Sequence, residues 1–220
     1  MTSHTQLLLS KYPIISDQIK KPALAVVLGQ LERILSDSKP LGAVVEFGCY
    51  VGTTSLFIRR MLDNYQQSSA RQFHVYDSFE GLPEKTSDDQ SSVGVDFRGG
   101  ELAVGRKQLL TEFQKVHLVP PKVHKAWFKD LTASQVPDNI AFAFLDGDFY
   151  ESILSSLRLV WPRLQPGGVV CIDDYQRPAL PGVERAVHDF FQAKARSEAT
   201  QITQSHNIGI ITRENNQKLL

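Results

Sequence analysis

Acidic residues stand directly after three short apolar segments of this sequence, at Asp77, Asp146, Asp148, Asp173 and Asp174. If the segments are parallel strands of one sheet, their carboxyl ends share a rim, and ligands bind at such rims. Carboxylates gathered in one place are costly unless something positive lies among them. A hard divalent cation with oxygen ligands is the natural compensation. The pattern therefore indicates a site in which one carboxylate of a pair could bind a metal ion while the other accepts a proton.

A fourth apolar segment ends in the loop Gly48-Cys49-Tyr50-Val51-Gly52. Two glycines four residues apart after a strand let the backbone approach a ligand closely. The spacing is not the GxGxxG of a nicotinamide enzyme, and an ordinary tight strand–helix turn explains it about equally well. Asp77 follows one helix and one strand later, which favours a role in binding ribose hydroxyls over a turn or capping role.

Asp148 also has a structural alternative. It precedes a predicted helix, and Glu151 stands at the spacing of a capping box. Asp148 could therefore cap that helix instead of accepting a proton.

Hydrophobic periodicity supplies the elements that would position these residues. Strands are predicted at residues 43–47, 73–76, 116–119, 141–145, 169–172, 200–203 and 208–212. Helices are predicted over much of 1–40, from Thr53 or Thr54 as the cap to about Asp63, and at 101–115, 151–161 and 183–195. Apolar strands alternating with helices are typical of a mostly parallel sheet covered on both faces. The polar stretch 78–100 is predicted to be a loop that closes over substrates, with Gly94, Gly99 and Gly100 as hinges.

The composition excludes several classes of protein. The chain has 220 residues, 24 basic and 24 acidic side chains, and two cysteines. The charge balance gives no general attraction to nucleic acid or membrane, and two cysteines cannot form a disulfide framework. No apolar run is long enough to cross a bilayer, and the first residues lack the pattern of a signal peptide. We therefore expect a cytoplasmic α/β enzyme.

Five blocks of the sequence resemble the macrocin O-methyltransferase (TylF/MycF) family of class I S-adenosylmethionine-dependent methyltransferases. The first block, at residues 46–55, is similar to the generic first motif of class I enzymes. The more specific blocks lie at residues 76–83, 145–152, 172–175 and 182–190. The region before the fourth predicted strand departs from the family at Ala126, where a glycine is expected.

The resemblance implies a Rossmann-like fold with a seven-stranded, mostly parallel sheet, helices on both faces and a reversed C-terminal hairpin. It implies a methyltransferase domain at residues 41–220. The helical segment at 1–40 is expected to be shorter than in the sugar enzymes, and to cover the acceptor or form a dimer contact. S-adenosylmethionine is the implied donor and Mg²⁺ the implied cofactor. The implied donor-site residues are Glu46, Gly48, Tyr50, Thr53, Ser55, Asp77, Ser78 and Asp146. The implied metal ligands are Asp146, Asp173 and Asp174, and the implied general base is Asp148.

The expected function is Mg²⁺-dependent methyl transfer to a hydroxyl of a small molecule, a sugar or another specialised metabolite. The resemblance makes a homodimer one option, and the sequence leaves the oligomeric state open. One alternative is a catechol-type O-methyltransferase acting on vicinal phenol hydroxyls. Another is a non-catalytic binding module on the same kind of sheet, although such a module would have little need for both carboxylate pairs. Neither nucleic acid nor membrane is an expected partner.

Overall fold

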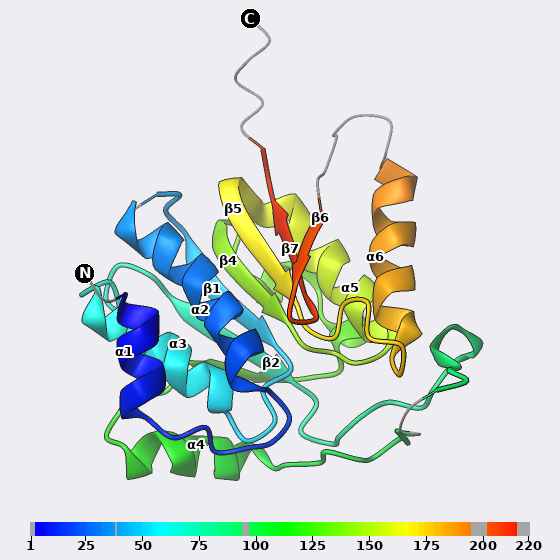
Figure 1. Cartoon of the computed structure of the whole chain (residues 1–220), viewed down its shortest axis with the longest axis horizontal. Helices are drawn as coiled ribbons and strands as arrows, with labels where there is room; N and C mark the ends of the chain where they lie inside the picture. Colours follow the sequence, from blue (N-terminus) through cyan, green and yellow to red (C-terminus); the bar gives the residue numbers. More distant parts are fainter. Residues whose placement is uncertain (1–2, 38, 94–96, 195–201, 215–220) are drawn as a thin grey trace, which may run out of the picture.

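A single mixed sheet forms the centre of the computed structural model, which describes residues 3–37, 39–93, 97–194 and 202–214 (Figure 1). Within these ranges the strand order is β3-β2-β1-β4-β5-β7-β6. The strands are β1 (Ala43–Phe47), β2 (Phe73–Asp77), β3 (Lys122–Lys125), β4 (Ile140–Leu145), β5 (Leu164–Ile172), β6 (Ile202–Ser205) and β7 (Ile208–Thr212). Strands β1 to β5 are parallel, whereas β7 runs antiparallel to both β5 and β6. The predicted seven-stranded sheet with a reversed C-terminal hairpin is confirmed.

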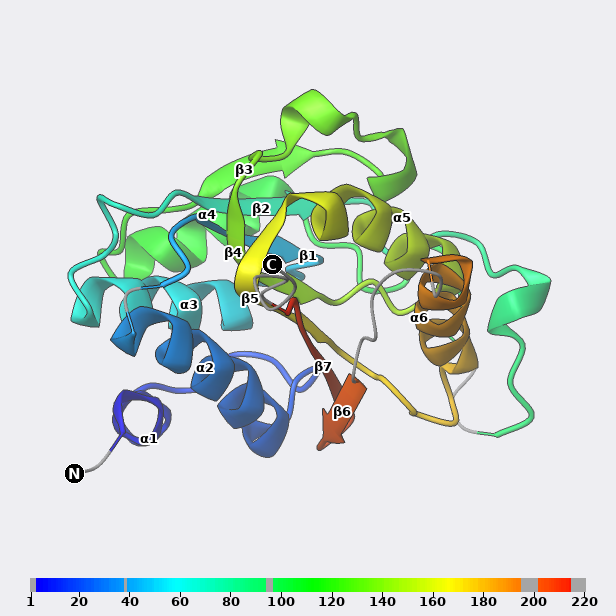
Figure 2. The ribbon, with the colours of Figure 1, turned by 90° about the horizontal axis from the view of Figure 1, so that it is seen from above.

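Helices cover both faces of the sheet (Figures 1 and 2). One face packs against α1 (His4–Lys11), α2 (Lys21–Ser36), α3 (Thr53–Asn64) and α4 (Arg106–Lys115). The other packs against α5 (Tyr150–Val160) and α6 (Pro181–Lys194). Strand side chains alternate between faces, so Phe142 and Phe144 of β4 join the first core and Ala143 and Leu145 the second. In the described part of the chain, no helix has the length and apolar character needed to span a bilayer.

The register of the parallel strands brings their carboxyl ends level. Phe47 of β1 pairs with both Tyr76 of β2 and Leu145 of β4, and Leu145 pairs with Ile172 of β5. The next residues along these strands therefore meet at one rim: Gly48, Asp77, Asp146 and Asp173. This rim is where ligands bind in open α/β sheets.

The third strand is not where the hydrophobic pattern placed it. Residues 116–119 form the turn after α4, in which the Leu118 N–H donates to the Phe113 carbonyl, and Val119 is 71% exposed. The strand is the more polar Lys122–Lys125, paired only with β2 at the edge of the sheet. Edge strands tolerate charged side chains. A prediction based on apolar residues therefore selected the wrong segment for this strand. The preceding helix begins at Arg106 rather than at residue 101.

Two predicted helix caps are wrong. The N-cap of α3 is Gly52, whose φ of 91° is left-handed, and Thr53 and Thr54 are already buried helical residues. The N-cap of α5 is Phe149, so Asp148 does not cap that helix. The Glu151 carboxylate accepts a hydrogen bond from Ser155 Oγ at 3.0 Å, one turn further along α5. The capping alternative for Asp148 is thereby excluded.

The remaining boundaries shift by small amounts. Helix α6 begins at Pro181, and β6 begins at Ile202, while residues 195 and 200–201 of the predicted elements lie outside the described residues. The stretch 78–100 is a loop as predicted, and it contains the short 3-10 helix η1 (Ser87–Asp89). The predicted hinge Gly94 lies outside the described residues.

Leu28 of α2 is fully buried in the first core, so Leu28→Ala is expected to lower the free energy of unfolding by about 2–5 kcal/mol. Urea denaturation measures this difference. Leu41→Ala is the matched control, because Leu41 is 69% exposed and its truncation should change stability by about 0.5 kcal/mol or less. Equal effects at the two positions would contradict the assigned packing of α2.

Candidate active site

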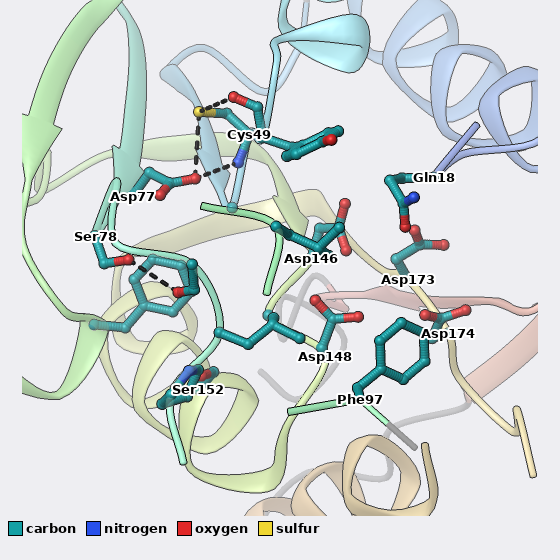
Figure 3. Close-up of a pocket in the computed structure, with 18 of the residues that line it drawn as sticks. Gln18, Cys49, Asp77, Ser78, Phe97, Asp146, Asp148, Ser152, Asp173 and Asp174 are labelled. Atoms are coloured by element: carbon teal, nitrogen blue, oxygen red, sulfur yellow. Dashed lines mark hydrogen bonds between the residues drawn. The ribbon is translucent and has the colours of Figure 1, made fainter. Parts of the chain in front are cut away.

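A cavity opens at the carboxyl rim of the sheet (Figure 3). Most of the predicted site residues line it: Gly48, Tyr50, Asp77, Ser78, Asp146, Asp148, Asp173 and Asp174. Figure 3 shows Cys49, Asp77 and Ser78 on one side and Asp148, Asp173 and Asp174 on the other, with Asp146 between them. The prediction that the strand-end carboxylates meet in one place is confirmed.

The glycine loop passes tightly over the end of β4. Gly48 has a φ of 88°, and a Cβ atom there would lie 1.8 Å from the carbonyl oxygen of Asp146. Any side chain at this position would clash with backbone that cannot move aside. Tyr50, two residues later, also has a positive φ, of 48°. The loop thus needs glycine at residue 48 to lie against β4 and form one wall of the cavity.

Asp77 holds the loop in this position. Its Oδ2 accepts hydrogen bonds from the Cys49 N–H at 2.9 Å and from Cys49 Sγ at 3.4 Å, and its Oδ1 accepts one from the Phe79 N–H at 2.7 Å. An ionised carboxylate has about four acceptor positions, so Asp77 keeps capacity for a ligand hydroxyl. Burial, together with the charges of Asp77 and Glu46, raises the pKa of the Cys49 thiol well above its usual range. Cys49 is therefore a packing residue rather than a nucleophile.

The other side of the cavity concentrates negative charge. Burial, followed by repulsion from the neighbouring carboxylates, raises the pKa values of Asp146 and Asp173 well above their usual range. Burial and the charge of Asp174 raise the pKa of Asp148 to about 7. Burial also raises the pKa of Asp174, against the opposing effect of Arg177. Nη1 of Arg177 donates to both Asp174 oxygens, at 2.8 and 3.0 Å.

The backbone is strained where two of these carboxylates are held. Asp148 has a φ of 58° and Asp174 a φ of 53°, both in the left-handed region. Left-handed backbone is uncommon outside glycine, although aspartate tolerates it better than most residues. Such conformations cluster at sites where the surrounding structure fixes a functional side chain.

The chemistry of this donor set suits a divalent cation. Four carboxylates line the same cavity, and oxygen ligands of this kind are those that Mg²⁺ prefers. In the part of the chain that the structure describes, no three His, Cys, Asp or Glu side chains converge closely enough to hold an ion. Binding would therefore require these carboxylate side chains to reorient.

The three remaining predicted donor-site residues, Glu46, Thr53 and Ser55, are buried behind the glycine loop. Oε2 of Glu46 accepts a hydrogen bond from Ser55 Oγ at 2.5 Å, which ties β1 to the first turn of α3. Among the described residues, Oε1 of Glu46 and Oγ1 of Thr53 have no hydrogen-bond partner. These side chains support the loop from behind and are not part of the cavity lining.

The cavity also contains residues that the sequence patterns did not reveal. Arg177 and Gln18 supply polar groups, and Figure 3 shows Gln18 beside Asp173. Arg177 could have been identified from the sequence, because it follows Asp174 by only three residues. Gln18 comes from a segment without any motif. The remaining wall is largely apolar: Leu82, Pro83, Phe97, Leu102, Trp127 and Phe128.

Glu46 provides a test of the buried support behind the loop. Burial raises its pKa from the usual 4.5 to about 8, the Ser55 hydrogen bond opposes this shift, and the charge of Asp77 adds to it. The folded protein therefore holds a proton that the unfolded chain loses above pH 4.5, so stability falls as the pH rises toward about 8.

Glu46→Gln removes this titration, and the free energy of unfolding of the variant relative to the parent is expected to rise by up to about 1.4 kcal/mol per pH unit across that window. Urea denaturation at a series of pH values measures the change. The exposed control Glu101→Gln should keep the pH dependence of the parent. Parallel stability profiles for the parent and Glu46→Gln would contradict the assignment.

Comparison with known proteins places the chain in a family. The family model described as "Macrocin-O-methyltransferase (TylF)" matches residues 20–212. The 8-demethyl-8-(2,3-dimethoxy-alpha-L-rhamnosyl)-tetracenomycin-C 4'-O-methyltransferase of Streptomyces olivaceus is 37% identical over 165 residues, which cover 73% of this chain and 61% of that protein. The mycinamicin III 3''-O-methyltransferase of Micromonospora griseorubida is 32% identical over 172 residues, which cover 73% of this chain and 64% of that protein.

The fold is also shared with a solved structure. The O-methyltransferase NovP superposes with a TM-score of 0.77 at 25% identity, over 90% of this chain and 81% of that one. The matches to the two curated relatives span less than two thirds of their lengths. The fold is thus that of the Rossmann-like class I methyltransferases, and the chain belongs to the macrocin-O-methyltransferase (TylF) family.

Proposed function

We propose that this protein transfers a methyl group from S-adenosylmethionine to a hydroxyl of a small molecule, a sugar or another specialised metabolite, with Mg²⁺ as cofactor. The observation that carries the proposal is the rim cavity, in which the Asp77-held glycine loop faces a group of carboxylates, in a chain of this family. The names of the two curated relatives describe methyl transfer to oxygen, one on a rhamnosyl tetracenomycin and one on mycinamicin III.

The donor is assigned to the side of the cavity formed by the glycine loop, Asp77 and Ser78. The bonds from Cys49 and Phe79 leave Asp77 able to accept a ribose hydroxyl, because Oδ1 has one unused acceptor position. Gly48 keeps the loop low against β4, which leaves room for a ligand above it. Glu46, Thr53 and Ser55 contribute from behind by fixing the loop and the start of α3.

The acceptor hydroxyl is assigned to the carboxylate side. Asp148 lines the cavity in the strained turn between β4 and α5, and a carboxylate oxygen there accepts the proton that the hydroxyl loses. Asp146, Asp173 and Asp174 would hold Mg²⁺, which when bound lowers the free-energy cost of deprotonating the hydroxyl. The cavity walls orient the hydroxyl toward the methyl group, and orientation of this kind supplies much of the rate of a transfer reaction.

The segment 1–40 is assigned to the acceptor side of the cavity. Gln18 lies in the connection between α1 and α2 and lines the cavity, which favours acceptor cover over a dimer contact for this part of the segment. A homodimer involving other parts of 1–40 is compatible with this placement.

The proposal is tested by incubating the protein with S-adenosylmethionine, Mg²⁺ and two acceptor panels, rhamnosylated natural products and catechols, and detecting methylated product by mass spectrometry. Methylation of the glycosides alone is expected. Methylation of catechols alone would support the catechol-type alternative, and no product with either panel would contradict the proposal.

Asp148→Asn is expected to lower turnover by about 10²-fold to 10⁴-fold, because the amide cannot accept the proton. The dissociation constant for S-adenosylhomocysteine, measured by calorimetry, should stay within about twofold, which is about 0.4 kcal/mol. Asp138→Asn, an exposed position, is the matched control and should behave as the parent. Turnover near that of the parent in Asp148→Asn would exclude it as the base.

Removal of divalent cations with a chelator should abolish turnover, and added Mg²⁺ should restore it. Asp173→Ala is expected to lose both turnover and its stimulation by Mg²⁺, because a carboxylate ligand is removed. Turnover of the parent and of the variant is measured at a fixed concentration of S-adenosylmethionine while Mg²⁺ is titrated. The same fold stimulation in the parent and in Asp173→Ala would contradict the ligand assignment.

A further inference from the structure

Asp89 joins three elements at one buried point beside the cavity. Its side chain belongs to η1 in the 78–100 loop, and the residue is 2% exposed. Oδ1 accepts a hydrogen bond from the Tyr150 N–H at 2.6 Å. Oδ2 accepts two more, from the Thr86 N–H at 3.0 Å and from Thr86 Oγ1 at 2.8 Å. Both carboxylate oxygens are therefore engaged, one with the loop itself and one with the first residue of α5.

This contact satisfies a helix end that has no local cap. Helix N-termini leave backbone N–H groups without intrahelical partners. The residue at the N-cap of α5 is Phe149, which cannot accept a hydrogen bond through its side chain. Asp89, 61 positions earlier in the chain, takes that role for Tyr150. Tyr150 follows Asp148 by two residues, so the same hydrogen bond ties the loop to the turn that carries the proposed base.

Helix α6 leaves space for this arrangement. A Cβ atom on Gly182, in the first turn of α6, would lie 2.1 Å from Oδ1 of Asp89 and 3.0 Å from the Tyr150 nitrogen. A side chain at this position would therefore have to displace the Asp89 carboxylate. More exposed contacts join the loop to α6 and to the segment before it. Arg185 of α6 pairs with Asp88 at 2.9 Å, and Ser91 Oγ donates to the Pro178 carbonyl at 2.7 Å.

The segment between the cavity and Asp89 is short. Leu82 and Pro83 line the cavity, and Asp89 follows Pro83 by six residues. Between them, Nζ of Lys85 lies 5.8 Å from the centroid of the Phe149 ring. The returning part of the loop is bonded to Leu82, whose N–H donates to the Glu101 carbonyl at 2.8 Å and whose carbonyl accepts from the Gly100 N–H at 2.8 Å.

We propose that Asp89 is a positioning residue that holds the apolar wall at Leu82 and Pro83 beside the Asp148 turn, and so sets the affinity for the acceptor. This inference rests on the proposed function. The apolar wall is assigned to the acceptor because Phe97, on the same loop, lies beside Asp148 and Asp174 (Figure 3). The loop is thus held at its far end by a buried carboxylate.

Asp89→Asn is the direct test, since it preserves size but replaces one acceptor oxygen with an NH₂ group. Because N–H and O–H donors face both oxygens, the amide must lose the bond to Tyr150 or those to Thr86. Gly182→Ala is the second variant, because its methyl group displaces the carboxylate while alanine favours the helix. Asp88→Asn is the matched control at an exposed neighbour whose side chain pairs with Arg185.

Hydrogen exchange of peptides covering residues 82–90 and 149–154 provides a readout that needs no acceptor. Both test variants should exchange about tenfold faster in these peptides, as expected for loss of a buried charged hydrogen bond. The KM for the rhamnosyl tetracenomycin acceptor should rise about tenfold, with kcat and the dissociation constant of S-adenosylhomocysteine within about twofold. Asp88→Asn should match the parent in every measurement.

Unchanged exchange in Asp89→Asn would overturn the proposed anchor. The proposal would also be overturned if Asp89→Asn weakened the binding of the acceptor and of S-adenosylhomocysteine equally, with a matching loss of thermal stability. Asp89 would then be a general structural residue. Failure of the parent to bind S-adenosylhomocysteine or to methylate the acceptor would contradict the proposed function instead. In that case, hydrogen exchange still tests whether Asp89 holds the loop in place.

Discussion

Crowding of buried carboxylates at the carboxyl rim is the constraint around which the rest of the structure is arranged. Asp146, Asp148, Asp173 and Asp174 line one cavity, and burial disfavours the charged form of each. Repulsion from neighbouring carboxylates adds to this effect at Asp146, Asp148 and Asp173. Such a group persists only where rigid elements hold it. Strands β4 and β5 provide that rigidity, because β4 is buried along its whole length and β5 over its last residues. Arg177 offsets part of the charge at Asp174.

The glycine loop packs closely against the end of β4 at the same rim. Gly48 passes within contact of the Asp146 carbonyl, and Asp77 bonds to the loop through Cys49. The cavity is thus bounded by two sides with different chemistry, one of the glycine loop, Asp77 and Ser78, the other of carboxylates and apolar side chains. This division suits the proposed transfer of a methyl group from S-adenosylmethionine to a hydroxyl.

Much of the fold could be predicted from the sequence because the central strands are apolar on both faces. The pattern placed β1, β4 and the end of β5 correctly, and the acidic residues after them predicted the rim. It failed at β3, where an edge strand carries Lys122 and Lys125 while the apolar residues 116–119 lie in a turn. Hydrophobicity reports burial, and an edge strand is too little buried to be distinguished from an exposed turn in this way.

The site was predictable only where its residues follow strands. Arg177, Gln18 and Asp89 come from loops, and tertiary contacts between distant segments bring them to the cavity or next to it. Motif similarity selected Glu46, Thr53 and Ser55 together with Gly48, but a motif does not distinguish a cavity-lining residue from one that supports it from behind. That distinction depends on the direction of each side chain, which the fold supplies.

Calorimetric titration of S-adenosylmethionine and S-adenosylhomocysteine into the purified protein, with and without Mg²⁺, tests the central claim most directly. The account predicts binding of both ligands with micromolar dissociation constants, about −8 kcal/mol. It also predicts that both bind in the absence of Mg²⁺, because the glycine loop and Asp77 lie on the side of the cavity away from Asp173 and Asp174. Absence of binding under both conditions would contradict the claim, and the acidic rim would then require a different ligand.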